Sequence, residues 1–279
     1  MNRLKFHVPL LLLSGAAFLV AQEPARTNSI GMDLVLIQPG SMAVGRYQLT
    51  CPDPNAPRPT GSGTVPLTAE EYARCQELTK RDNTPGFPVK IDHPFYMGKF
   101  EVTQGQWKKV MGRNPSVFQG DKIKEGDPDR YRVDNVTWAD AQAFVKKLNA
   151  MERTKAYRLP TEFEWEYAAR AGAGQATLWS QIGEYSWFSG NNTGSTHPVG
   201  QKKPNAWGLY DMVGNVWEWV QDWYNERTLP DPTPPKRGKV HVLRGASFSA
   251  DQTGANFFFH GGGPADGFDV GFRIAMDVK

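Results

Sequence analysis

The residues best suited to acid–base chemistry lie in one short segment near the end of the chain. Asp251 and His260 bracket this segment, and three glycines, Gly261–Gly263, follow the histidine. An imidazole titrates near neutral pH, so His260 on a glycine-rich loop could accept a proton, and Asp251 could serve as a general base. A lone histidine is more often only hydrogen-bonded, so a structural role for His260 stays open.

An amide and three aromatic rings stand between these two residues, at Asn256 and Phe257-Phe258-Phe259. Successive side chains of an extended run point to opposite faces, so the three rings cannot all enter the core. At least one ring is therefore expected at a surface or cleft, where it could stack on a flat substrate. Asn256 and Phe258 are our candidates for substrate binding.

A second group of carboxylates, Glu162 and Glu166, resembles a catalytic pair at first sight. The two residues are one helical turn apart, and Arg158 and Arg170 are close enough in sequence to neutralise them. Helix capping and ion pairing explain this pattern without catalysis. We predict that structural role.

The composition predicts a single aromatic-rich domain and excludes several function classes. The 279 residues include 32 basic and 29 acidic side chains, which leaves a net charge of +3 and no basic run, so we expect no nucleic-acid partner. Aromatic residues make up 12% of the chain, alongside 28 Gly and 21 Pro. This balance favours aromatic packing joined by irregular loops over long helices.

The N-terminus has the pattern of a secretory signal peptide. Arg3 and Lys5 precede an apolar stretch of residues 8–20, which is short for a membrane span, and polar sequence begins at Gln22. We expect residues 1–21 to be removed, which gives a periplasmic protein without a membrane attachment. An uncleaved anchor is the alternative.

Export determines how the two cysteines are interpreted. Cys51 and Cys75 are the only cysteines, and they flank a segment rich in Pro and Gly. In an oxidising compartment two such residues usually pair, and a bridge over a loop of this size contributes about 3 kcal/mol in the chain-entropy model. We predict a disulfide; metal binding is the weaker alternative, because the intervening segment contains no histidine.

The rest of the chain contains helix starts that share one capping signature, a Thr followed three residues later by Glu, Gln or Asp. The four pairs are Thr68 with Glu71, Thr103 with Gln106, Thr137 with Asp140, and Thr161 with Glu164. Residues 32–39 predict a short strand and turn, and helical periodicity fades after Gly172. No linker interrupts the chain, so we expect one domain over residues 22–279 with a Pro/Gly-rich insertion at about 46–88.

Several motifs in order along the chain resemble the formylglycine-generating enzyme family, also called the sulfatase-modifying factor family. The resemblance covers about residues 30–279 and implies an α+β fold related to C-type lectins, with little regular secondary structure. The segments that carry it are Asn114–Ser116, Arg158–Arg170, Pro204–Trp219, Leu243–Phe248 and Val270–Arg273.

The resemblance also implies a structural calcium site. Its ligands would be the side chains of Asp211 and Glu218 and the carbonyl groups of Gly214 and Val216. Calcium prefers carboxylate and carbonyl oxygens, so these residue types suit the ion. A second calcium site of the family would lie near residues 186–200, where this sequence departs from the pattern, and we do not carry that site over.

The family's oxidase chemistry uses two cysteines that bind copper(I), and here the matching positions are Ala250 and Ala255. Soft thiolates suit that metal, so we expect neither copper nor formylglycine generation. The His-x3-His-x-Glu iron motif of another relative is absent as well. Trp217 and Ser247 still match family positions that line the substrate groove, and we expect them to bind substrate.

An exported member without the catalytic thiols resembles those relatives that mature the chromophore of pyoverdine, a peptide siderophore. The resemblance implies oxidation of the dihydro precursor of that chromophore, with the peptide siderophore precursor as partner. The alternative is a non-catalytic envelope scaffold of the same fold that binds a peptide or a glycan. Sequence alone leaves open whether the protein is an enzyme.

Overall fold

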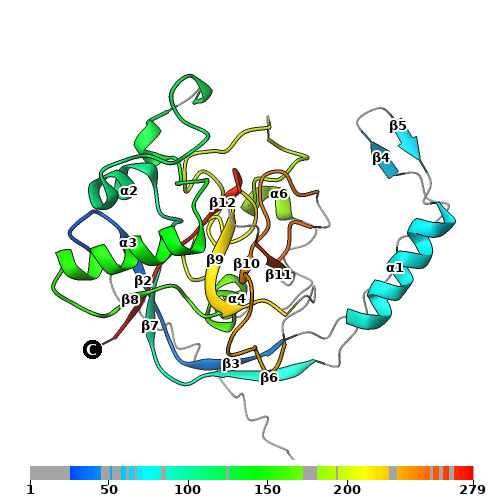
Figure 1. Cartoon of the computed structure of the whole chain (residues 1–279), viewed down its shortest axis with the longest axis horizontal. Coiled ribbons are helices and arrows are strands. Elements are labelled where there is room, and N and C mark those ends of the chain that lie inside the picture. The colour runs from blue at the N-terminus through cyan, green and yellow to red at the C-terminus, as the bar shows by residue number, and fades with distance from the viewer. Residues whose placement is uncertain are drawn as a thin grey trace, which may run out of the picture.

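The structure is a computed structural model (Figure 1). It describes residues 26–44, 51, 58–60, 63–65, 68–82, 86–123, 126–171, 181–192, 194–225, 231–251, 254–257, 260–263 and 267–278. The predicted signal peptide, residues 1–21, lies outside the described residues.

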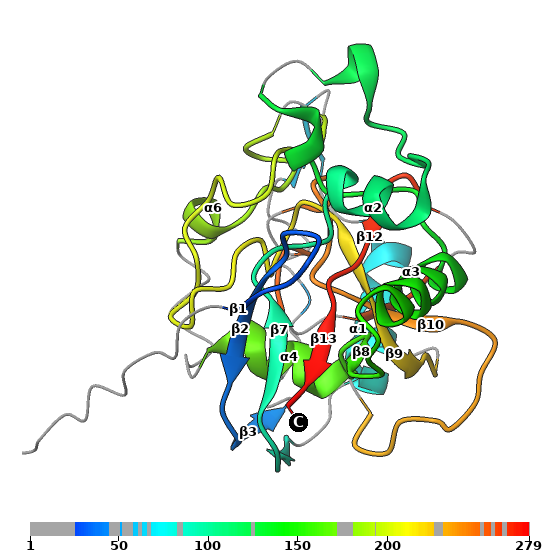
Figure 2. The same ribbon diagram turned by 90° about the vertical axis from the view of Figure 1, so that its left-hand side faces the viewer.

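A five-stranded sheet joins the two ends of the described chain (Figure 2). Its order is β1-β2-β7-β13-β8, and each pair is antiparallel. The strands are β1 Arg26–Thr27, β2 Asp33–Ile37, β7 Phe95–Gly98, β13 Ala275–Asp277 and β8 Tyr157–Arg158. The strand predicted within residues 32–39 is therefore confirmed as β2.

A second sheet of four strands brings the C-terminal motifs together. Its order is β11-β10-β9-β12, with β12 parallel to β9 and the other pairs antiparallel. The strands are β9 Trp217–Trp223, β10 His241–Arg244, β11 His260–Gly262 and β12 Val270–Gly271. The parallel pairing sets Val270 opposite Trp217, so residues far apart in sequence become neighbours.

The helices begin where the capping signatures predict. The box is complete at Thr103, Thr137 and Thr161, and Thr68 and Glu71 cap each other in the same way. The helices are α1 Ala69–Asp82, α2 Gln104–Met111, α3 Trp138–Met151, α4 Glu162–Arg170 and α6 Ile182–Tyr185, with short 3-10 turns η1 Gly120–Lys122 and η2 Pro128–Arg130.

Aromatic plates fill the space between helices and sheets. Trp107 of α2 stacks on Phe144 of α3 at a centroid distance of 5.5 Å, and Phe272 packs its edge against both rings. All three rings are buried. The buried face of α3, made of Ala141, Phe144, Val145 and Leu148, belongs to the same core.

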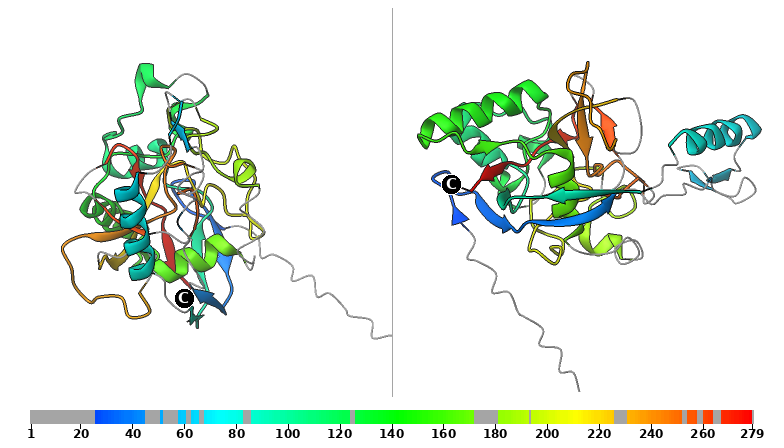
Figure 3. Two further views of the ribbon diagram at one scale, coloured as in Figure 1. Left: turned by 90° about the vertical axis from the view of Figure 1, so that its right-hand side faces the viewer. Right: turned by 90° about the horizontal axis from the view of Figure 1, so that it is seen from below.

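An arm extends from the body on a two-stranded ribbon. Strand β3, Gly40–Val44, pairs with β6, Phe87–Ile91, and the ribbon leads to the hairpin of β4 Arg58–Thr60 and β5 Gly63–Val65 and to α1. Figures 1 and 3 show α1 and this hairpin set apart from the rest of the fold.

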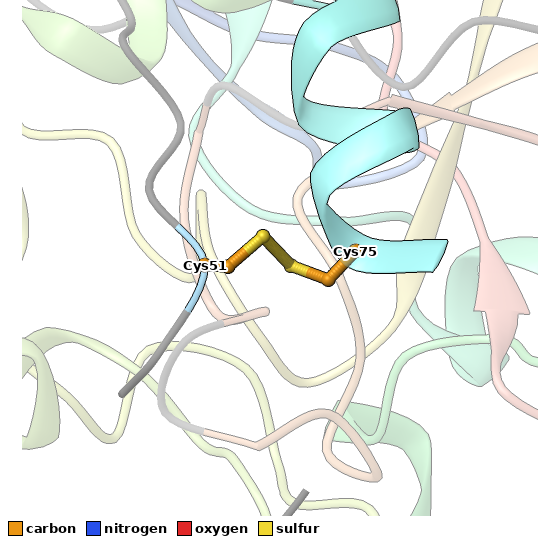
Figure 4. Close-up of a disulfide and its surroundings, with 2 residues drawn as sticks. All are labelled: Cys51 and Cys75. Atoms are coloured by element: carbon orange, nitrogen blue, oxygen red, sulfur yellow. A yellow bond between two sulfur atoms is a disulfide. The ribbon is translucent and has the colours of Figure 1, made fainter. Parts of the chain in front are cut away.

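The predicted disulfide is present in the arm (Figure 4). Cys51 and Cys75 are bonded, with their Cα atoms 5.9 Å apart, and so the bridge ties α1 to the chain that leaves the ribbon. The arm falls within the insertion predicted at about 46–88.

The arrangement is α+β with modest helix content, as expected from the resemblance. Across the ranges that the structure describes, no helix combines the length and apolar character needed to cross a membrane.

Candidate functional site

Trp217 and Ser247, the two residues expected in a substrate groove, meet at a third residue, Asp269. The backbone N–H of Trp217 donates to the carbonyl oxygen of Asp269 at 2.9 Å. The hydroxyl of Ser247 donates to Oδ2 of the same aspartate at 2.6 Å. The pairing of β9 with β12 produces this meeting, since Asp269 directly precedes β12.

Ser249 completes this group. Its Oγ donates to Oδ2 of Asp269 at 3.1 Å and lies 2.8 Å from Oγ of Ser247. Ser247 is fully buried, Asp269 is half-buried and Ser249 is exposed, so the group leads from the interior to the surface. The sequence analysis missed Asp269 and Ser249; their only signal was closeness to the motifs Leu243–Phe248 and Val270–Arg273.

The copper-ligand positions of the family contain methyl groups in this chain. Ala250 is half-buried beside Ser249, and Ala255 is fully buried. Both cysteines of the sequence are bonded to each other in the arm. The chain therefore offers no thiolate to a soft metal at this place.

His260 lies in strand β11 and not on the open loop expected from its glycine neighbours. Its Nδ1 is 2.5 Å from Oε1 of Glu162, and the imidazole is buried, with 2% of the side chain exposed. Tyr224 packs edge-on against the ring. Nε2 is also buried, and within the described ranges it has no hydrogen-bond partner. This environment favours a structural role, and catalysis by His260 stays a prediction.

The carboxylates of α4 are buried in ion pairs, which confirms the structural role predicted for them. Arg244 binds Glu166 at 2.6 Å and Glu162 at 3.3 Å, and Arg170 also pairs with Glu166. Burial alone would raise the pKa of Glu162, but the charge of His260 and its hydrogen bond hold that pKa below its usual range.

Two other predicted residues of this segment, Asp251 and Asn256, lie outside helices and strands. Asp251 is exposed, and its Oδ1 accepts the backbone N–H of Gly254 at 2.7 Å. Asn256 is buried, and Phe258 lies outside the described residues. Asp251 and His260 thus lie in different surroundings. Asp251 is exposed at the surface, whereas His260 has a buried side chain at the start of β11. A catalytic or binding role for these residues stays a prediction.

The expected calcium ligands differ in how well they suit a cation. Oδ2 of Asp211 accepts the N–H of Gly200, whereas its Oδ1 is buried and has no hydrogen-bond partner among the described residues. Glu218, in contrast, already accepts hydrogen bonds from Arg273 at 2.6 and 2.7 Å and from the indole of Trp165 at 2.7 Å. The charge of Glu218 is therefore balanced by an arginine, whereas Asp211 retains an oxygen for another ligand.

Glu101, which the sequence analysis did not single out, offers a second such oxygen. Its Oε2 accepts from Asn215 at 2.9 Å, and its Oε1 is buried with no donor in the part of the chain that the structure describes. Burial, and next the charges of Asp211 and Glu218, raise the pKa of Glu101 well above its usual range. Burial likewise raises the pKa of Asp211 to about 6.

A bound cation would compensate both of these buried carboxyl groups, so Asp211 and Glu101 fit calcium better than Asp211 and Glu218 do. In the described part of the chain, no three His, Cys, Asp or Glu side chains converge as metal ligands. Backbone carbonyls, such as those of Gly214 and Val216, would therefore have to contribute.

Comparison with known proteins defines the class of this chain. Residues 20–278 match the family model of the sulfatase-modifying factor enzyme 1-like domain, so the chain belongs to the formylglycine-generating enzyme family. This agrees with the resemblance found in the motifs.

Particular relatives differ in what their names describe. The chain is 32% identical to the chaperone protein LppX of Paenibacillus barcinonensis over 64% of this chain and 79% of LppX. It is also 32% identical to the formylglycine-generating enzyme of Streptomyces coelicolor, over 62% of this chain and 61% of that enzyme. Its fold matches PvdO from Pseudomonas aeruginosa with a TM-score of 0.64, at 21% identity over 92% of this chain and 99% of PvdO. That last likeness describes the fold alone.

Proposed function

We propose that this protein is exported to the periplasm and oxidises the dihydro precursor of a pyoverdine-type chromophore on a peptide siderophore. One observation carries the proposal. Trp217 and Ser247, which match substrate-groove positions of the family, meet at Asp269, whereas the two positions that match the family's copper-binding cysteines are alanine. Such a site suits a substrate that is easily oxidised without a copper thiolate centre.

The proposed reaction removes two hydrogens from the dihydroxyquinoline-type ring. The ring loses two electrons and two protons, and dioxygen as acceptor would take up both to form hydrogen peroxide. A phenolic ring is electron-rich, so the protein's contribution is to bind and orient it and to accept a proton. Asp251 and His260 are the bases predicted from sequence, and both can be tested in the same assay.

Deletion of the gene in the producing organism tests the proposal. We expect the mutant to secrete a siderophore with a dihydro chromophore that lacks the fluorescence of the mature form. Complementation with the wild-type gene should restore fluorescence, and Asp251→Asn and His260→Ala complements would show whether either side chain is required. Normal amounts of mature chromophore in the deletion strain would reject the assignment.

We also propose that the protein binds one structural calcium ion through Asp211, Glu101 and the carbonyls of Gly214 and Val216. The two buried, unpartnered carboxylate oxygens support this assignment. When bound, the ion would offset their charge and fix the loop that leads into β9. The expected result is a calcium-dependent rise in Tm that chelator reverses. Glu101→Gln should abolish the rise and Asp33→Asn should retain it; an equal response in both variants would contradict the ligand assignment.

A second candidate function is a non-catalytic scaffold in the cell envelope that binds a peptide or a glycan. The similarity to a relative named as a chaperone protein favours it. Purified protein separates the two candidates. An enzyme converts the dihydro precursor with turnover, whereas a scaffold binds a partner stoichiometrically and leaves the precursor unchanged.

A further inference from the structure

Three phenylalanine rings from separate segments form a wall beside Asp269. Phe118 packs edge-on against Phe248 at a centroid distance of 5.4 Å, and Phe268 lies 6.2 Å from Phe248 and 6.5 Å from Phe118. Phe118 comes after α2 and Phe248 comes after β10. Phe268 lies in the turn that precedes β12. We call Phe118, Phe248 and Phe268 the phenylalanine wall.

The outermost ring of the wall is unusually open to solvent. Phe268 is 52% exposed, whereas Phe248 is only 4% exposed and Phe118 is half-buried. Within the described residues, the exposed large apolar side chains are Met151, Phe268 and Val278. Leaving so large an apolar side chain in water forgoes the stabilisation that burial gives, and exposed apolar surface with polar neighbours often marks a binding site.

The polar neighbour of Phe268 is the next residue, Asp269. Its Oδ2 accepts the hydroxyl protons of Ser247 and Ser249, which fix the carboxylate in place. No donor within the described residues reaches its Oδ1. One carboxylate oxygen is therefore held beside the wall with capacity for further hydrogen bonds.

We propose that Asp269 and the phenylalanine wall bind a flat aromatic ring that carries adjacent hydroxyl groups, a catechol. The ring packs on Phe268, one of its hydroxyls donates to Oδ1 of Asp269, and the other donates to the exposed Oγ of Ser249. This inference deepens the proposed function, on which it rests for the identity of the substrate.

The chemistry of the site favours a catechol over a sugar. Both ligand classes have hydroxyl donors, but a sugar bears hydroxyls around its whole perimeter and needs donors and acceptors on several sides. Among the described residues, the site combines the oxygens of Ser249 and Asp269 with three rings that carry no polar atoms. A catechol has the same division, with an apolar face and one edge of donors.

A binding assay with a simple probe tests the site without requiring turnover. The protein, expressed from its full-length gene, is titrated with 4-methylcatechol under argon and followed by calorimetry or ligand-observed NMR. We expect saturable 1:1 binding, weakened about tenfold by Asp269→Asn and by Phe268→Ala. The dimethoxy analogue of the probe has no hydroxyl donors, so it should bind wild type about tenfold more weakly than the probe does. Its affinity for Asp269→Asn should equal its affinity for wild type.

Two matched variants control for general effects. Met151→Ala removes an apolar side chain that is 51% exposed, close to the value for Phe268. Asp33→Asn alters a carboxylate that also accepts a hydroxyl, from Thr27 at 2.7 Å, on strand β2. Both controls should bind the probe as wild type does, and all variants should retain the wild-type circular dichroism spectrum.

The outcomes separate this inference from the proposed function. Probe binding that depends on Asp269 and Phe268, together with a siderophore that matures normally in the deletion strain, would support the site and reject the pathway. Absence of probe binding, equal affinity in Asp269→Asn, or preferential binding of a glucose oligomer at the same residues would overturn the catechol site even if the deletion strain fails to mature its siderophore.

Discussion

Two groups of polar side chains in this protein illustrate opposite uses of the same residue types. The sealed cluster, Glu162, Glu166, Arg244 and His260, is buried between α4 and the second sheet, where Arg244 pairs with both carboxylates and His260 bonds to Glu162. The open cluster, Ser247, Ser249 and Asp269, runs from the interior to the surface and ends beside an exposed phenylalanine.

The difference teaches where chemistry can occur. A titratable group contributes to binding or catalysis only if a ligand can reach it, and the imidazole of His260 is enclosed by Glu162 and Tyr224. The carboxylate of Asp269, in contrast, is half-buried beside the exposed Ser249, where a ligand can reach it. Accessibility, more than residue type, therefore separates a structural acid–base pair from a candidate site.

The largest expected effect comes from breaking the sealed cluster at its centre. Arg244→Met would leave Glu162 and Glu166 buried without this cation, so the free energy of unfolding should fall by about 3–5 kcal/mol. Urea denaturation followed by tryptophan fluorescence measures the change. Asp269→Asn, the matched disruption of the open cluster, should change stability by about 1 kcal/mol or less. Equal losses of unfolding free energy in the two variants would contradict the distinction between a structural sealed cluster and an open cluster that stability does not require.

Removal of the imidazole should be smaller in effect but still structural. His260→Ala loses a buried hydrogen bond to a carboxylate, which predicts a loss of about 2 kcal/mol in unfolding free energy. Catechol binding per folded molecule should be unchanged. If instead the variant keeps its stability and loses turnover of the dihydro precursor, His260 is the catalytic base that the sequence suggested.

A pH series sharpens the comparison at the edge of the sealed cluster. Burial, followed by the charges of Glu162 and Glu164, raises the pKa of Asp222 to about 6 from 3.8, although the N–H of Glu162 donates to it. Between pH 3.8 and about 6, the Asp222 carboxyl is therefore protonated in the folded state and ionised in the unfolded chain. Asp222 therefore makes stability fall as pH rises through this window.

The Asp222→Asn variant isolates this contribution. It should flatten the decline between pH 4 and 6 by about 1 kcal/mol relative to wild type. Unfolding free energies at several pH values give the slope, and parallel curves for the two proteins would contradict the assignment.

The smallest effect is expected from the arm. The double variant Cys51→Ser, Cys75→Ser removes the bridge between α1 and the chain near residue 51. Both bonded residues belong to the arm, and neither belongs to the sealed or the open cluster. Closure of such a loop could contribute about 3 kcal/mol within the arm, but the Tm of the body should hold within about 1 °C. Differential scanning calorimetry measures this Tm; a large drop would show that the arm supports the core.

Local signals in the sequence predicted much of the fold. The capping boxes at Thr103, Thr137 and Thr161 depend on residues three positions apart, so the sequence predicts them without knowledge of the tertiary structure. The disulfide was predicted from the cysteine count and the expected export, and the α+β class was predicted from the resemblance that the ordered motifs carry.

The candidate site was less predictable, because its partners come from distant segments. The parallel pairing of β12 with β9 brings Asp269 to Ser247. Phe118, which contacts Phe248, comes before α3 in the sequence, whereas the rest of the site comes after it. Nothing in the glycines after His260 indicated a buried strand with Glu162 as partner. Nor did the motif around Glu218 reveal that Arg273 would bind it.

The central claim is that the accessible carboxylate of Asp269, and not the buried imidazole of His260, serves the ligand. Turnover of the dihydro precursor by wild type, Asp269→Asn and His260→Ala, each normalised to folded protein, tests this claim most directly. The account predicts that kcat/KM falls about tenfold for Asp269→Asn, in line with its weaker ligand binding, and changes within about twofold for His260→Ala. The reverse order, with His260→Ala inactive and Asp269→Asn active, would contradict it.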